Sequence, residues 1–203
     1  MTTAAIDLDA ITLEKGSHPP DDGVCVMELS ARIAGEPHSD NPECVSPAIA
    51  TFLRSWNDSL SDEDRQRLKP WAARVIGTRG TQEDEERRAW LATDWLARTF
   101  ASAWLDLAGL ETHATALRSL PGLTSDETAE QAMAVLSAAR SAARSAARSA
   151  AESAARSAAW SAAESAAWSA ATKTLAPTVA LLQDSAEELL ARMVAVGRQE
   201  VAA

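Results

Sequence analysis

Apolar residues recur at helical spacing along most of the chain. Ile49, Phe52, Leu53 and Trp56 follow the spacing i, i+3, i+4, i+7, so they share one face of a helix. β-branched residues never alternate with polar ones over the length of a strand. The pattern therefore predicts an all-α protein of about six to eight helices.

Capping residues and helix breakers divide the first 120 residues into separate helices. The helix over 81–109 carries the widest apolar stripe, from Trp90 to Leu105, and we expect it to be the central core helix. Asp21 or Asp22 is expected to cap the first helix. The predicted helices cover residues 22–34, 47–57, 61–68, 71–76, 81–109 and 111–120.

Residues 137–172 form nine consecutive Ser-Ala-Ala-X units. Alanine is the best helix former, and no glycine or proline interrupts the chain from Thr124 to Pro177, so one long helix is predicted there. Four residues overshoot one helical turn by about 40°, so the variable positions wind around the helix. We therefore expect a thin helical rod of alanine and serine, not a conventional coiled coil.

The variable positions change character along the repeat. The first half carries arginines and the second half carries tryptophans. Three interpretations remain open: the two ends bind partners, the basic end packs near the acidic cluster 83–86 while the tryptophans complete the core, or the repeat is a neutral expansion of the gene. The candidate interaction residues are Arg140, Arg144, Arg148, Trp160 and Trp168.

The expected organisation has four parts, with the larger apolar residues concentrated before residue 110 and after residue 175. The parts are a flexible N-terminal lead over 1–21, a helical core domain over 22–122, the repeat helix over 123–174, and a C-terminal helix over 177–197 that packs on the core.

The net charge of −10 argues against nucleic acid as a partner, because an acidic surface repels phosphates. No run of about 18 uncharged apolar residues is present, so no membrane span is expected. The first fifteen residues lack the pattern of a secretory signal, and two cysteines do not make a disulfide framework. We expect a cytoplasmic protein with free thiols, which binds another protein or associates with itself.

One segment concentrates residues that could ligate a metal. Zinc, the metal that such donors would suit, requires four N, S or O ligands, but the spacing lacks the tight pairs of structural zinc sites. The same residues could make a thiol nucleophile with His38 as its base. A third interpretation is a proline-fixed polar loop that caps helix ends. The candidate ligands are Cys25, Glu28, His38 and Cys44, with His18 or Asp40 as a further donor.

Three stretches together form a recognisable pattern: GVCVME at 23–28, AGEPHSDNPECVSP at 34–47 and FLRSWND at 52–58. With the turns at 68–70 and 76–78 and an alanine- and tryptophan-rich carboxyl half, this pattern resembles an uncharacterised protein family of actinobacteria and their phages. The resemblance implies an actinobacterial or phage cytosol, and it implies that the segment 25–47 matters to the protein. It implies no activity.

No catalytic motif and no other cofactor motif stands out. Our first hypothesis is a non-enzymatic interaction or scaffold protein that uses the repeat helix to bind a protein partner or a second copy. The alternative is a metal- or thiol-dependent enzyme that uses the Cys25–Cys44 segment.

Overall fold

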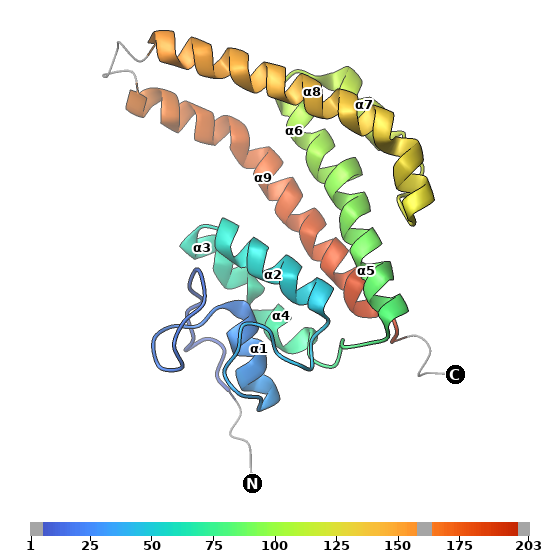
Figure 1. Cartoon of the computed structure of the whole chain (residues 1–203). Coiled ribbons are helices and arrows are strands. Elements are labelled where there is room, and N and C mark those ends of the chain that lie inside the picture. Colours follow the sequence, from blue (N-terminus) through green and yellow to red (C-terminus); the bar gives the residue numbers. More distant parts are fainter. Residues whose placement is uncertain (1–5, 158–163, 199–203) are drawn as a thin grey trace. The chain divides into compact units, whose positions relative to one another are not determined.

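A computed structural model describes residues 6–157 and 164–198 of the chain. Within those ranges the regular secondary structure is entirely helical, which confirms the predicted all-α class (Figure 1). The elements are α1 (Val26–Ala34), α2 (Pro47–Ser59), α3 (Asp62–Arg65), the 3₁₀ turn η1 (Gln66–Leu68), α4 (Lys69–Arg74), α5 (Gln82–Trp95), the π-helical segment η2 (Leu96–Ala101), α6 (Ser102–Leu107), α7 (Glu111–Arg118), α8 (Asp126–Ser157) and α9 (Glu164–Ala195).

The chain divides into two compact units. Unit 1 contains residues 1–89 and 190–203, and unit 2 contains residues 90–189. The division falls inside α5 and inside α9, so each of these helices contributes to both units. The expected core domain over 22–122 spans this division, and Trp90 of α5 packs against the unit 2 cluster that takes residues from α7 and α8.

Unit 1 is built around α1, which packs against α2 and α4. Six consecutive residues of α1, from Val26 to Ala31, are buried, so this short helix has almost no solvent-exposed face in its first half. The last turns of α9 also belong to unit 1, and their Leu190 and Met193 are fully buried. The last turns of this helix therefore bury apolar side chains, whereas its packing on a core domain over 22–122 stays a prediction.

Capping explains where the helices of unit 1 begin and end. Ser46 caps α2 by accepting a hydrogen bond from the Ile49 amide, with Pro47 at the first helical position, as predicted. Gly35 ends α1 in the left-handed conformation with φ 74°, which is open to glycine without strain. The predicted cap of α1 at Asp21 or Asp22 is wrong, because the helix begins four residues further on, after Cys25.

The lead before α1 was expected to be flexible, but its described part is held against unit 1. Leu13 is buried, and its backbone exchanges hydrogen bonds with the side chain of Gln66. Asn57 donates to the Glu14 carbonyl at 2.9 Å. Residues 1–5 lie outside the described residues.

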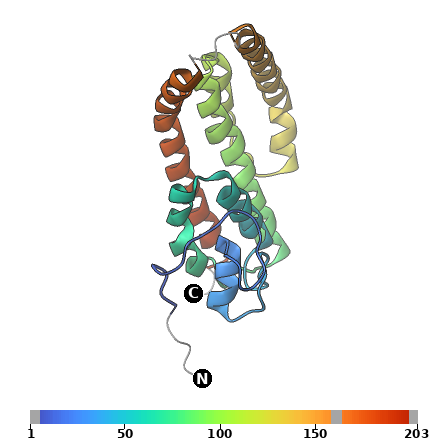
Figure 2. The same cartoon turned by 90° about the vertical axis from the view of Figure 1, so that its left-hand side faces the viewer.

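Unit 2 contains the remainder of α5 and its continuation through η2 and α6, a helical course drawn in green in Figure 2. This course was expected to be the central core helix. It is only half buried: Leu105 and Ala97 are buried, whereas Leu96 is 51% and Phe100 37% exposed. A π-turn shifts the residues after it around the helix axis, so spacing based on 3.6 residues per turn misplaces them.

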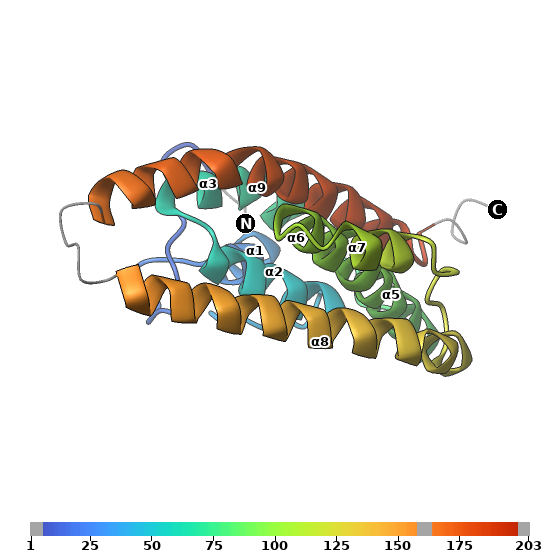
Figure 3. The same cartoon turned by 90° about the horizontal axis from the view of Figure 1, so that it is seen from above.

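The short helix α7 packs against η2, α6 and α8, and Figure 3 shows it beside α6 and α8. Its Ala114 and Leu117 are fully buried in a cluster that also takes Leu123 from the following loop and Ala132 and Ala139 from α8. The core of unit 2 is therefore built largely from alanine and leucine.

The repeat lies on two elements, because α8 contains its residues 137–157 and α9 contains 164–172. Residues 158–163 lie outside the described residues, so one helix across the whole repeat stays a prediction. The predicted helix end at Pro177 is wrong, since Pro177 stands inside α9. The residues on both sides of Pro177 are helical, although a proline removes one backbone hydrogen bond of the helix.

No described helix combines the length and the apolar character needed to cross a membrane.

Candidate functional site

The predicted metal segment is organised around the carboxylate of Glu28, which is 1% exposed. One oxygen accepts the Cys25 amide at 2.7 Å, while the Cys25 thiol accepts the Glu28 amide at 3.5 Å, so the two residues form a reciprocal cap on α1. The other oxygen accepts the His18 amide at 2.7 Å. These contacts give Glu28 and Cys25 a structural task at the beginning of α1.

Two imidazoles lie against this carboxylate. Nδ1 of His18 is 3.0 Å from Oε2 of Glu28, and Nε2 of His38 is 3.7 Å from Oε1. Nε2 of His38 also lies 2.8 Å from the carbonyl oxygen of His18, so this nitrogen donates a proton and has no lone pair to offer a metal in that tautomer. Burial disfavours ionisation of Glu28, but the hydrogen bonds from Cys25 and His18 outweigh it and hold the pKa of Glu28 below its ordinary value.

Cys44 has different neighbours. Its amide donates to the Glu36 carboxylate at 2.8 Å, and its carbonyl accepts the amides of Gly77 and Arg79. The structure therefore brings His18, Cys25, Glu28 and His38 together but gives Cys44 a separate environment. In the described chain no group of three or more His, Cys, Asp or Glu side chains has a geometry suited to a metal ion.

The surroundings of both thiols favour the protonated form over the thiolate. Burial raises the pKa of the Cys25 thiol to about 12, and the neighbouring Glu28 carboxylate adds to the rise. Burial and the Glu36 carboxylate also raise the pKa of Cys44. Activated cysteines have lowered pKa values, because the thiolate is the reactive form. The pKa values of Cys25 and Cys44 are raised instead.

The predicted interaction residues of the repeat have separate locations. Arg140 lines a cavity in unit 2, whereas Arg144 and Arg148 are exposed on the same helix and do not line it. Trp160 lies outside the described residues. Trp168 belongs to α9, but its side chain lies outside the described part of the structure.

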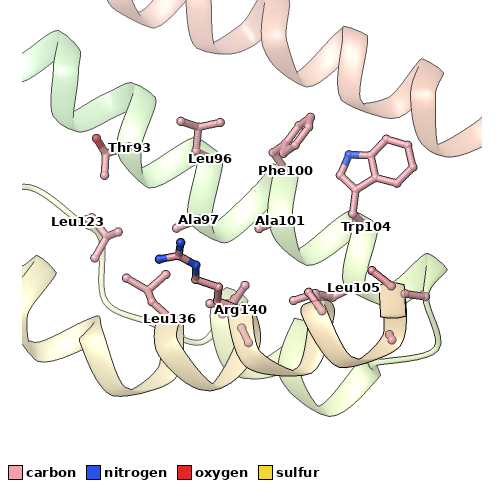
Figure 4. A pocket seen from close by; sticks show the side chains of 16 residues that line it. Thr93, Leu96, Ala97, Phe100, Ala101, Trp104, Leu105, Leu123, Leu136 and Arg140 are labelled. Atoms are coloured by element: carbon pink, nitrogen blue, oxygen red, sulfur yellow. The ribbon is translucent and has the colours of Figure 1, made fainter. Parts of the chain in front are cut away.

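The cavity is an open apolar groove of about 820 Å³ between two walls, shown in Figure 4. We call it the unit 2 groove. Its large-residue wall comes from η2 and α6 and contains Leu96, Ala97, Phe100, Ala101, Trp104 and Leu105. Its small-residue wall comes from α8 and contains Leu136, Ala139, Arg140, Ala143, Ala146 and Ala147.

The sequence explains why this space is left open. On α8 the repeat supplies alanines, whose short side chains do not reach across to the opposite wall. On the opposite wall the π-helical segment ends where the Ser102 hydroxyl donates to the carbonyls of Arg98 and Thr99, at 2.7 and 3.0 Å. The ring of Phe100 lies 5.5 Å from that of Trp95 and 6.2 Å from that of Trp104, which fixes an aromatic row along the helix.

Among the described residues that line the unit 2 groove, Arg140 is the one with a charged side chain. Figure 4 shows its guanidinium lying near Ala97 and Leu136, at the Leu123 end of the groove and away from Trp104. Sequence reasoning identified Arg140 as an interaction residue but missed the groove. The sequence feature that indicated the groove is the apolar stripe from Trp90 to Leu105. It is wider than the single face that a helix buries against a core.

Comparison with known proteins yields no match: no protein-family model fits the chain, and no curated protein or solved structure is significantly similar to it. The resemblance to an actinobacterial and phage family therefore stays a prediction.

Proposed function

We propose that this chain is a non-enzymatic binding protein that holds a small apolar molecule in the unit 2 groove. The observation that carries the proposal is the groove itself, with its large-residue wall, its alanine wall and one charged side chain, Arg140, among the described lining residues. Sites for small molecules are concave, mostly apolar and supplied with a few polar groups. A volume of about 820 Å³ lies within the range of roughly 300–1,000 Å³ that such sites span.

Exposed side chains on the large-residue wall support the proposal. Leu96 and Phe100 lie in the groove with half and more than a third of their surface exposed. Covering such side chains with an apolar ligand is favourable by about 25 cal/mol for each Å² removed from water. The π-helical segment that carries them is a further support, since π-turns occur frequently at functional sites.

The alanine wall favours a small molecule over a protein helix as the occupant. Protein interfaces gain most of their affinity from a few large anchors that fill pockets, typically Trp, Tyr and Arg. Four of the six α8 residues that line the groove are alanines, which offer shallow contact to such anchors. The protein partner or second copy expected from the repeat stays a prediction, and the test below distinguishes it.

The test is a titration of the purified full chain with Nile red, an uncharged apolar dye whose emission increases and shifts to the blue in apolar surroundings. We expect saturable binding. The variant Ala143→Trp fills the groove from α8 and should abolish it, whereas Ala138→Trp, at an exposed position of α8 outside the groove, should bind as the natural sequence does.

Two outcomes would overturn the proposal. One is the absence of saturable dye binding by a folded chain, and the other is equal binding by both tryptophan variants. Light scattering on the same samples measures the oligomeric state. A dimer that binds no dye would favour self-association and contradict a small-molecule site.

A further inference from the structure

The charge distribution within the unit 2 groove is uneven. Arg140 places one positive charge at the Leu123 end, while the opposite end, at Trp104, carries no charged side chain among the described lining residues. Among the described lining residues, the other polar side-chain groups are the Thr93 hydroxyl and the indole N–H of Trp104. The groove therefore has a cationic end and an uncharged end.

Arg140 has no carboxylate partner among the described residues, and the nearest acidic side chains of the α5–α6 course have other partners. Asp94 accepts the Leu123 amide at 2.9 Å and Arg98 at 3.2 Å. Asp106 forms a bidentate ion pair with Arg118, with N–O distances of 2.6 and 3.2 Å. The described residues thus supply no internal anion to the guanidinium in the groove.

A guanidinium beside an apolar surface favours a partner with two acceptor oxygens. Its fork of N–H donors matches a carboxylate, and hydrogen bonds between charged groups are about twice as strong as those between neutral groups. Arg140 is exposed at one end of an open groove, so the apolar wall beside it strengthens the pair only modestly relative to one fully in water. A negatively charged head group at the Leu123 end would satisfy both requirements.

On the basis of the proposed function, we infer that the unit 2 groove binds a single-chain carboxylate of the fatty-acid type, with its head group on Arg140 and its chain directed toward Trp104. From Ala97, which lies near the Arg140 guanidinium, to Ala108, the last lining residue of the α5–α6 course, there are eleven steps along a helical course, which is about 16 Å at 1.5 Å per residue. This length accommodates a medium-length acyl chain. The alanines of α8 leave the chain room along the opposite wall.

The experiment compares dodecanoate with 1-dodecanol, two ligands with the same chain and different head groups, each kept below the concentration at which it aggregates. Affinities come from displacement of Nile red from the full chain. Because the two head groups differ in hydration, the informative quantity is the ratio of alcohol Kd to acid Kd, compared between protein variants as in a double-mutant cycle.

Arg140→Met removes the charge from an exposed helical position and keeps an unbranched chain. We expect it to lower the ratio by about five- to tenfold, as the loss of one charge-assisted pair in a partly open groove implies. The affinity for dodecanol should change by less than about twofold, because the alcohol makes no ion pair. Arg144→Met is the matched control on the same helix and should leave the ratio unchanged.

The outcomes separate this inference from the proposed function. Loss of both ligands and of Nile red from the natural sequence would refute the groove as a binding site. Binding of both ligands with an unchanged ratio in Arg140→Met would refute the carboxylate inference alone. An equal loss in Arg144→Met would show a general attraction of anions to the basic half of α8 and would also overturn the role of Arg140.

Discussion

Replacement of Arg88 by methionine should destabilise unit 1 more than any exposed substitution. Arg88 is 1% exposed, and its guanidinium donates to the carbonyls of Met193 at 3.1 Å and Val196 at 2.8 Å, at the end of α9. A third donor reaches the Glu85 carboxylate at 2.7 Å. One side chain thus joins the first turns of α5 to the last turn of α9, and it satisfies carbonyls that a helix end leaves without partners.

The expected cost follows from these contacts. Hydrogen bonds to charged groups contribute about 1.5–3 kcal/mol each. Glu85 keeps its bonds from the Ser46 hydroxyl and the Ala48 amide, so its carboxylate is not left wholly without donors. We therefore expect Arg88→Met to lower the free energy of unfolding by about 3–5 kcal/mol, the range observed when one partner of a buried ion pair is removed.

Urea unfolding followed by far-ultraviolet circular dichroism measures this change. Arg87→Met, one residue earlier and exposed, is the control and should change stability by less than about 0.5 kcal/mol. Arg88→Lys keeps the charge with fewer donors and should lie between the two. Equal unfolding midpoints for Arg88→Met and Arg87→Met would refute the reasoning.

Three further predictions concern other parts of the chain. The depressed pKa of Glu28 contributes stability that is present above its unfolded pKa and is lost as the pH falls through the folded value, so the natural chain should lose this stability below about pH 4. Glu28→Gln should cost about 1–3 kcal/mol at pH 7 and much less at pH 3, and parallel stability curves against pH would contradict this. In the folded protein Cys25 should not react with Ellman's reagent until urea unfolds unit 1, and rapid reaction would contradict its burial and raised pKa. Pro177→Ala should raise the free energy of unfolding by about 1–3 kcal/mol, because it restores a backbone hydrogen bond within α9. A lower free energy of unfolding in thermal denaturation would contradict this.

Local signals predicted much of the fold. Ser46 with Pro47 and the glycine at 35 act through their own backbone and side chains, so their effect is visible in the sequence. The beginning of α1 was mispredicted because cysteine is a weak acceptor and is not among the usual capping residues. The reciprocal Glu28 contact makes Cys25 the cap, and only the folded geometry reveals it.

The π-helical segment limited the prediction of the α5–α6 course. A spacing rule of 3.6 residues per turn assigned Leu96 and Phe100 to a core face, whereas the structure exposes both to the groove. No residue type marks such a segment reliably, because it depends on hydrogen bonds that local sequence does not specify. Packing of the alanine-rich α8 against this course is likewise a tertiary property.

The candidate site was predicted in part. The residue types of the Cys25–Cys44 segment suggested a set of metal ligands. In the fold, however, Cys44 has separate neighbours, and the Glu28 carboxylate oxygens accept hydrogen bonds from backbone amides. Arg140 was identified through the repeat, where it is one of several equivalent arginines. Its position in a groove distinguishes it from Arg144, and that distinction requires the three-dimensional structure.

Methyl NMR of leucine-labelled full chain during a titration with dodecanoate tests the central claim most directly. The unit 2 groove predicts saturable shifts of the Leu96, Leu105 and Leu136 methyl signals, with the buried Leu29 and Leu53 of unit 1 unchanged. Shifts that spread evenly over both units, or no shifts at saturating ligand, would contradict the account.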